Sequence, residues 1–295
     1  MNILITGGRG FIGRPLVREL RQSGHQIVVT TREKTTSEEA LTWNPPELLP
    51  SDTMSRFDAV INLAGEKIAP ARWTKEKKES ILSSRVNTTR ALVRSIHNSL
   101  TKPRVLISAS AIGYYGARDD EFITEDALPG TDFLAEVCVK WEQEAFRAEE
   151  YGTRVVTVRI GGVLEADGGA LPTMALPFKF FLGGPIGKGS QWFSWIHRDD
   201  VVGIILYVLE NSSVKGPVNA TAPNPVTNRD FSAALGKILH RPSRLAVPGF
   251  MVKLTLGELG AVLLKGQRVI PEKAVKAGYV FKYGDLHEAL RVIYA

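Results

Sequence analysis

Short apolar runs of strand length recur along the first two thirds of the chain, and segments with helical periodicity lie between them. The runs are apolar almost throughout, which is typical of strands that are buried on both faces of a parallel sheet. The predicted strands are residues 3–6, 26–31, 41–43, 58–63, 104–108, 154–160 and 217–221. The predicted helices are residues 12–23, 75–98, 131–150 and 200–210.

This alternation predicts an α/β fold, a doubly wound parallel sheet of the Rossmann type. The sequence pattern changes after Gly161: residues 168–189 are rich in glycine and proline, and residues 223–295 are predicted to form mostly short helices. We therefore predict a Rossmann domain made of residues 1–164 and 195–221. Residues 165–194 and 222–295 are predicted to form a smaller substrate-side region.

A glycine-rich loop follows the first predicted strand and carries the strongest local signal. Gly7, Gly10 and Gly13 recur at every third position between a strand and a helix. Glycine at these places permits a tight turn, a close approach of a pyrophosphate, and packing of the helix against the strand. The N–H groups at the helix start then face the phosphates. An ordinary turn would explain Gly7 alone. The predicted cofactor-binding residues of this loop are Gly7, Arg9, Gly10, Phe11, Ile12 and Gly13.

The end of the second strand indicates which dinucleotide is bound. A cofactor without a 2′-phosphate usually meets an Asp or Glu there, whereas this chain has Thr31 followed by Arg32. Arg32 offers a forked donor to a phosphate, and Arg9 can supply a second. The pattern predicts NADP rather than NAD. The alternative is that both arginines are simply exposed.

A third cofactor contact is predicted at Leu63, Ala64 and Gly65, where the strand 58–63 ends. Ligands of open α/β sheets bind at the carboxyl ends of the strands. Small residues at this turn let a cofactor ring lie against the backbone. A plain turn glycine is the alternative interpretation.

The segments GGRGFIG, NLAG and SASAIGYYG together resemble the short-chain dehydrogenase/reductase superfamily, and in particular its extended, epimerase-like branch. The segments KWEQEA, PIGKGSQWFSWIH and LLKGQRVIPEKAVKAGYVFKY are similar to those of an atypical group within that branch. Members of this group are named nucleoside-diphosphate-sugar epimerases or oxidoreductases. The resemblance covers nearly the whole chain and implies a nicotinamide cofactor and a small-molecule substrate.

The resemblance also implies catalytic residues. The family's serine polarises a carbonyl or hydroxyl of the substrate, and Ser108 or Ser110 matches it; the alternative is that these serines only cap a strand end. The family's Tyr-x-x-x-Lys motif places a lysine on the nicotinamide ribose, where it also lowers the tyrosine pKa. Lys140 matches that lysine, but Glu136 occupies the position of the tyrosine.

Because Glu136 cannot copy a phenol, an enzyme of this sequence needs another proton donor. Tyr114 and Tyr115 are the candidates, since they follow the serine cluster. The alternative is that both rings only pack their loop. Further along the chain, His197 can serve as a general base or, as we expect, hold its loop by hydrogen bonding. Asp199 or Asp200 is well placed to cap the helix that follows.

The bulk composition narrows the partners and the compartment. Lys and Arg exceed Asp and Glu by 37 − 31 = 6, and the pI is near 9.4, but the basic residues are dispersed, so we expect no nucleic-acid partner. No apolar run is long enough to span a membrane, so we expect no membrane partner, and no signal peptide is expected. Cys138 is the only cysteine, which favours a reducing, cytoplasmic location. No metal-ligand spacing is present.

Two functions agree with these patterns. The first is an NADP-dependent, epimerase-like oxidoreductase of unknown small-molecule substrate, supported by the serine cluster and Lys140. The alternative is a non-catalytic NADP-binding protein that senses redox state or docks a partner, favoured by Glu136. A homodimer is compatible with either function.

Overall fold

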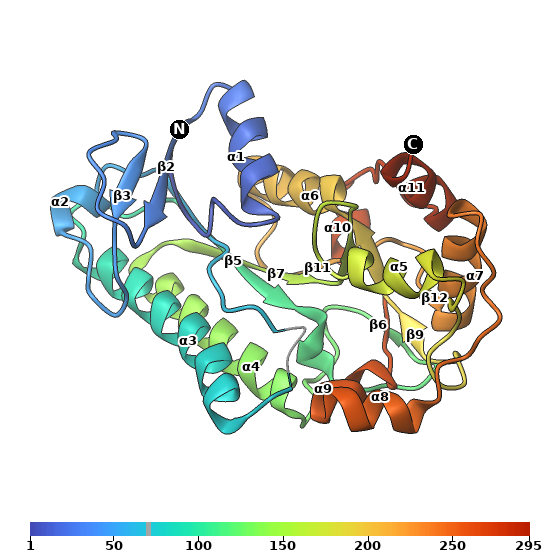
Figure 1. The fold of residues 1–295 in the computed structure, drawn as a ribbon. Helices are drawn as coiled ribbons and strands as arrows, with labels where there is room; N and C mark the ends of the chain where they lie inside the picture. Colours follow the sequence, from blue (N-terminus) through green and yellow to red (C-terminus); the bar gives the residue numbers. More distant parts are fainter. Residues whose placement is uncertain (69–71) are drawn as a thin grey trace.

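A seven-stranded parallel sheet forms the centre of the molecule (Figure 1). The computed structural model describes residues 1–68 and 72–295. The strand order is β11-β7-β5-β4-β1-β2-β3, and every neighbouring pair is parallel. The predicted doubly wound fold is therefore confirmed. The strands are β1 Asn2–Thr6, β2 Gln26–Thr31, β3 Ala40–Thr42, β4 Ala59–Asn62, β5 Val105–Ala111, β7 Arg154–Ile160 and β11 Gly216–Ala220.

Helices cover both faces of this sheet (Figure 1). Helices α1 (Gly13–Gln22) and α6 (Arg198–Glu210) pack on one face, and helices α3 (Lys75–Asn98) and α4 (Phe133–Phe146) pack on the other. The short helix α2 (Ser51–Met54) lies beside α3. The apolar stripe of α1, which includes the fully buried Leu16 and Leu20, faces the sheet. Burying one such side chain contributes about 1.5–3 kcal/mol.

The strand order reverses between β1 and β4, which are neighbours in the sheet although β2 and β3 lie between them in sequence. This reversal opens a crevice beyond the carboxyl ends of both strands, the place where open α/β sheets bind ligands. The glycine loop follows β1, and the turn at Leu63 follows β4. The predicted cofactor segments therefore meet at one edge of the sheet.

The remaining elements form smaller pairs and a second apolar core. Strands pair as β8 with β10, β9 with β12, and β6 with β13. The core of this region contains Trp195, Phe231 and Leu290, all buried. These elements are β6 Phe122–Ile123, β8 Gly162–Leu164, α5 Leu171–Lys179, β9 Trp192–Phe193, β10 Trp195–His197, β12 Val226–Thr227, α7 Asn228–Ile238, α8 Gly249–Leu256, α9 Glu258–Leu263, β13 Arg268–Val269, α10 Glu272–Lys276 and α11 Leu286–Ile293.

Most boundaries differ from the predictions by at most one residue, and three elements differ by more than that. Strand β5 continues to Ala111, because it pairs with β7 along its whole length. Helix α4 ends at Phe146, and a 3-10 turn continues to Tyr151. Helix α6 begins at Arg198. Within residues 1–68 and 72–295, no helix is long and apolar enough to cross a membrane, and no cluster of three metal-ligating side chains is found.

Candidate functional site

The glycine loop has the geometry of a phosphate cradle. Gly7 has a φ of 70°, a conformation that favours glycine. A Cβ on Gly13 would lie 2.3 Å from the Gly7 carbonyl oxygen, so α1 starts directly against the loop. A Cβ on Gly10 would meet that same oxygen at 3.1 Å and nothing else within 4 Å, so Gly10 borders open space. The N-cap residue of α1, Ile12, gives no side-chain hydrogen bond, so its side chain does not compete for the first N–H groups.

Arg9 reaches from this loop to the end of β2. Its Nη1 lies 3.4 Å from the Thr31 hydroxyl oxygen and 3.8 Å from the Glu33 carboxylate. Arg32, the next residue after Thr31, is exposed. Glu33 is a carboxylate that the sequence interpretation passed over; its side chain is 86% exposed, so a bound anion can replace it on Arg9 at little cost.

The turn after β4 touches the glycine loop. A Cβ on Gly7 would lie 2.8 Å from the Leu63 carbonyl carbon, and the Ala64 N–H donates to the Thr6 hydroxyl at 3.3 Å. Gly65 lies against the guanidinium of Arg85. The three predicted cofactor segments therefore converge on the crevice between β1 and β4.

Phe11 of the glycine loop contacts the segment that follows β8. Its ring packs against Gly168 and Gly169, and the Arg198 guanidinium lies 5.1 Å from the ring centre. Arg198 also pairs with Glu165 at 3.0 Å and with Asp167 at 2.5 Å. This segment thus borders the predicted phosphate site.

Ser108 and Ser110 lie inside β5 rather than after it, and both are buried. The Asn62 amide donates to the Ser108 hydroxyl at 3.3 Å. The Ser110 hydroxyl donates to the Glu142 carboxylate of α4 at 2.6 Å. The strand was predicted to end at Ser108, and this prediction is wrong, because β5 continues to Ala111 in register with β7. In this structure both hydroxyls bind protein partners below the crevice.

Arg159 of β7 is the centre of a buried polar network. It donates to both carboxylate oxygens of Glu142 at 2.8 Å and to the Tyr115 hydroxyl at 2.9 Å. The Tyr115 hydroxyl in turn donates to the Asn219 side chain of β11 at 2.6 Å. Burial raises the pKa of Tyr115 to about 12, more than the nearby Arg159 lowers it. Tyr115 is fully buried, so the expectation that its hydroxyl borders the cleft is wrong.

Tyr114 differs from Tyr115 in being only partly buried. Its ring lies over the Arg159 guanidinium, whose Cζ is 3.5 Å from the ring centre, and it packs edge-on against the ring of Tyr115. This stacking fixes the ring and agrees with the packing alternative. A role of Tyr114 as proton donor stays a prediction.

Glu136 and Lys140 form the ion pair that their spacing on α4 predicts. The Lys140 ammonium donates to the Glu136 carboxylate at 2.6 Å. Both side chains are about half exposed, at 55% for Glu136 and 48% for Lys140. Such an exposed pair contributes less than about 1 kcal/mol, so Lys140 can exchange Glu136 for another acceptor.

His197 and Asp200 have structural roles around the start of α6. The His197 Nδ1 accepts the Asp199 N–H at 3.1 Å, so His197 caps α6 and the predicted Asp cap is wrong. Burial lowers the His197 pKa. Asp200 is fully buried and accepts the N–H groups of Lys282 and Tyr283, at 2.7 and 2.9 Å.

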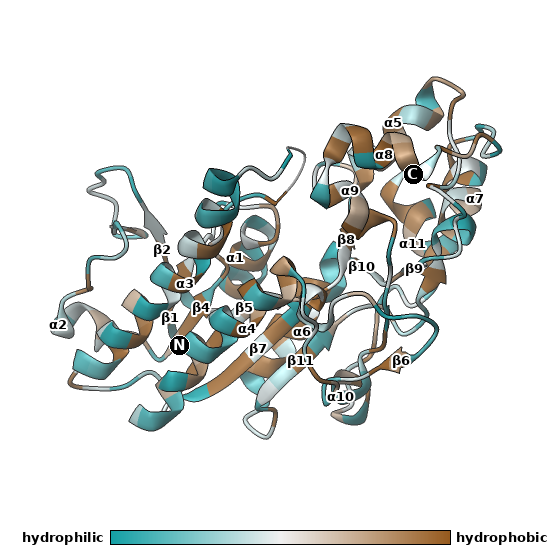
Figure 2. Ribbon diagram, turned by 90° about the horizontal axis from the view of Figure 1, so that it is seen from below, coloured by the Kyte–Doolittle hydropathy of each residue, from teal (hydrophilic) through white to brown (hydrophobic). Residues whose placement is uncertain are grey.

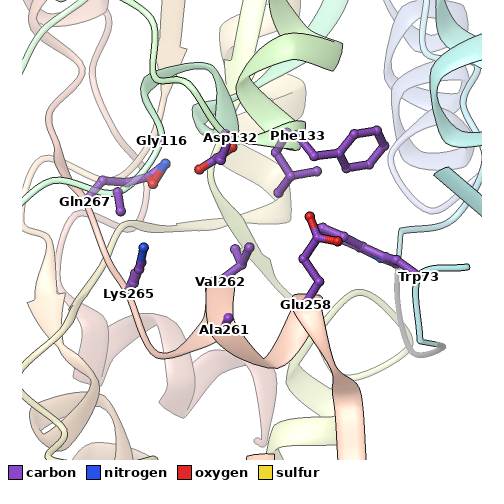
Figure 3. Close-up of a pocket in the computed structure, with 12 residues that line it drawn as sticks. Trp73, Gly116, Asp132, Phe133, Glu258, Ala261, Val262, Lys265 and Gln267 are labelled. Atoms are coloured by element: carbon purple, nitrogen blue, oxygen red, sulfur yellow. The ribbon is translucent and has the colours of Figure 1, made fainter. Parts of the chain in front are cut away.

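A cavity of about 160 Å³ lies between the start of α4 and helix α9 (Figure 3). The rings of Trp73 and Phe133 form one wall, edge to face at 5.4 Å. In Figure 3, Lys265 and Glu258 lie on the α9 side and Asp132 on the α4 side. The cavity therefore combines an aromatic wall with charged groups of both signs, and it is large enough for about one ring of a ligand.

Comparison with known proteins places this geometry in a family. The model of the NAD dependent epimerase/dehydratase family matches residues 3–220, and a domain of unknown function (DUF1731) matches residues 247–293. The chain belongs to the NAD dependent epimerase/dehydratase family. The first match includes the glycine loop, β4 and α4, so the resemblance to extended short-chain dehydrogenases is confirmed. The second match covers the tail that lines one side of the cavity.

Individual members of the epimerase family match the chain over its full length. The chain is 42% identical to the epimerase family protein YfhF of Bacillus subtilis, covering 100% of this chain and 98% of that protein. It is 44% identical to a chloroplastic SDR39U1 homolog of Arabidopsis thaliana, covering 99% of this chain and 86% of that protein. A crystal structure of human epimerase family protein SDR39U1 with NADPH has a TM-score of 0.91 and 35% identity, covering 100% and 99% of the two chains.

The sequence interpretation of this epimerase family member missed Glu142 and Arg159. Arg159 is a charged residue near the end of the mostly apolar strand RVVTVRI, and Glu142 lies in KWEQEA. A charged residue in a buried strand requires a partner, so Arg159 in the sequence already indicated a buried polar contact. The partner itself lies on another element, so local spacing could not identify it.

Proposed function

We propose that this protein binds NADP(H) across the crevice and uses it in an epimerase-like redox reaction on a small molecule. The observation that carries the proposal is the reach of Arg9 to within 3.4 Å of Thr31, beside Arg32. Two guanidinium groups at the end of β2 suit the 2′-phosphate that distinguishes NADP from NAD. The human relative crystallised with NADPH supports the same choice.

The residues present fit such a cofactor. Open space beside Gly10 and the start of α1 suit a pyrophosphate. The backbone at Leu63 and Ala64 borders the crevice where the rest of the dinucleotide would extend. When bound, the nicotinamide supplies or accepts a hydride. An added Cβ at Gly10 would occupy the open space in which the pyrophosphate is proposed to lie.

Lys140 has the position to hold the ribose next to the nicotinamide, once it gives up its exposed pair with Glu136. The cavity beside Trp73 and Phe133 is the proposed substrate site, since it borders the first turn of the same helix α4. Glu136, paired with Lys140, stands where the family's motif has a tyrosine, so this position offers no phenol as proton donor. We therefore expect slow turnover of ordinary ketone or sugar-nucleotide substrates. The buried, free Cys138 agrees with a cytoplasmic protein.

Calorimetry tests the cofactor assignment directly. Wild-type protein should bind NADPH more tightly than NADH, and Arg32→Ala should weaken NADPH binding by about 10- to 150-fold, since a hydrogen bond to a charged group contributes about 1.5–3 kcal/mol. Binding of NADH should stay unchanged. Lys34→Ala removes a nearby exposed charge and serves as the control. Equal affinity of the wild type for both cofactors would contradict the proposal.

A further inference from the structure

Large apolar side chains are exposed in the turn after α5 and along α8. The exposed fractions are 67% for Phe180, 59% for Leu182, 70% for Phe250 and 68% for Leu254. Fractions above one half mean that these residues are largely accessible to solvent. Single exposed apolar residues are ordinary, but a group of this size marks an interaction surface. We call the group the apolar rim: Phe180, Phe181, Leu182, Leu245, Phe250, Met251 and Leu254.

The two parts of the apolar rim are joined by paired backbone. The Leu245 N–H donates to the Gly183 carbonyl at 3.2 Å, and the Val247 N–H donates to the Pro185 carbonyl at 2.9 Å. Residues 183–187 and 245–247 thus run side by side from the turn after α5 to the start of α8. Figure 2 shows α5 and α8 at the end of the molecule opposite β2 and α2, with apolar colouring on α8. These paired segments therefore connect the two parts of the apolar rim through the backbone.

The backbone holds one aromatic ring of the rim outward at a cost. Phe181 has a φ of 62°, which bulky residues rarely adopt. Its ring is 57% exposed and lies under the Arg241 guanidinium, 4.7 Å from the ring centre. A strained conformation that exposes a phenylalanine points to use of that side chain at a surface.

The two sequence stretches that carry the apolar rim contain basic residues but no acidic ones. No acidic residue occurs between Asp167 and Asp199, or between Asp230 and Glu258, and these two stretches contain the whole rim. The exposed basic residues of the two stretches are Lys179, Lys188, Lys237, Arg241, Arg244 and Lys253. Lys237 shares a surface depression with Asp285 and Glu288, so the attraction to an anionic surface would come from the other basic residues.

We propose that the apolar rim docks this protein on a bilayer surface that contains anionic lipids. The projecting phenylalanines and leucines would enter the boundary between headgroups and acyl chains, while the basic residues meet lipid phosphates. An acidic helix of another protein would instead require an apolar groove to lie in. Helix α9, which lines the cavity, follows α8 directly after Gly257. Docking through α8 would hold the cavity close to the bilayer.

Sedimentation of the full chain with lipid vesicles tests this proposal. We expect the protein to bind vesicles of equal parts phosphatidylglycerol and phosphatidylcholine and to be released from them by high salt. Its affinity for neutral phosphatidylcholine vesicles should be lower by a factor of about ten or more. The double variant Phe250→Asp/Leu254→Asp should lose about tenfold or more in affinity for the anionic vesicles. The control Leu100→Asp/Val280→Asp changes two residues that are 86% and 85% exposed outside the rim, and it should bind like the wild type.

Further variants separate the contribution of the basic residues to vesicle binding from any effect of a substitution on folding. Lys179→Gln/Arg244→Gln/Lys253→Gln should also weaken binding about tenfold or more, whereas Lys34→Gln should not. Each variant must keep the wild-type unfolding temperature; if Phe250→Asp/Leu254→Asp does not, Leu182→Ser at the other end of the rim replaces it.

Four results would overturn the proposal. The first is no binding to anionic vesicles, and the second is an equal loss of binding in the control variants. The third is self-association through the rim, seen by light scattering as a dimer that Phe250→Asp/Leu254→Asp dissociates. The fourth is a rim that binds an acidic protein and no vesicles.

Discussion

Replacing Arg159 by Met should destabilise the protein strongly. The change removes two hydrogen bonds of 2.8 Å to Glu142, one of 2.9 Å to Tyr115 and one of 3.1 Å to the Glu125 carbonyl. It also leaves Glu142, which is only 4% exposed, without its cationic partner. Breaking a buried ion pair in this way costs about 3–5 kcal/mol. For a chain of this size, about 2 °C are lost per kcal/mol, so we expect the unfolding temperature to fall by about 6–10 °C.

The assay is thermal and urea unfolding at pH 7, followed by the fluorescence of the chain's five tryptophans. Arg147→Met is the matched control, because Arg147 pairs with Glu144 at 3.3 Å but is 59% exposed; its loss should cost less than about 1 kcal/mol. The double variant Glu142→Gln/Arg159→Met should recover part of the loss, since no unpaired charge remains buried. A cost for Arg159→Met no larger than that of Arg147→Met would refute this account of the network.

Two further predictions concern the cofactor and the reaction. Gly10→Val should abolish NADPH binding measured by calorimetry yet keep the wild-type unfolding temperature, since its Cβ meets only the Gly7 oxygen at 3.1 Å. Gly13→Val, by contrast, should unfold the loop. Intact NADPH binding by Gly10→Val would show that the loop holds no phosphates. Glu136→Tyr should raise any NADPH-dependent reductase activity, whereas Glu136→Gln, which also frees Lys140, should not. If wild-type turnover is rapid and survives Tyr114→Phe, the proton carrier is instead Glu136 or a water.

The fold followed from the sequence because its signals are local. The strands Gln26–Thr31 and Arg154–Ile160 and the helix Lys75–Asn98 have the bounds that were predicted. The glycine loop could also be predicted, since a strand, three glycines and a helix specify both the turn and its ligand-facing N–H groups. Each of these features depends on residues that are neighbours in sequence.

The orientation of the catalytic candidates could not be predicted in the same way. Whether Ser110 faces the crevice or α4 depends on the register of β5 against β7 and on Glu142, which stands 32 positions away. The burial of Tyr115 depends on Asn219, 104 positions away. A serine or tyrosine after an apolar run suggests chemistry, but only the elements packed against it decide whether its hydroxyl is occupied.

The C-terminal tail is part of the same polar interior. The buried Glu125 carboxylate accepts the Asn219 N–H of β11 at 2.9 Å and the Lys273 N–H of α10 at 3.2 Å, and burial raises its pKa. Asp200 of α6 accepts the N–H groups of Lys282 and Tyr283. Without the tail, Glu125 would lose the Lys273 N–H and Asp200 would lose the N–H groups of Lys282 and Tyr283, and a buried carboxylate without its donors is costly. The tail therefore stabilises buried carboxylates of the central sheet region, as well as forming one side of the cavity.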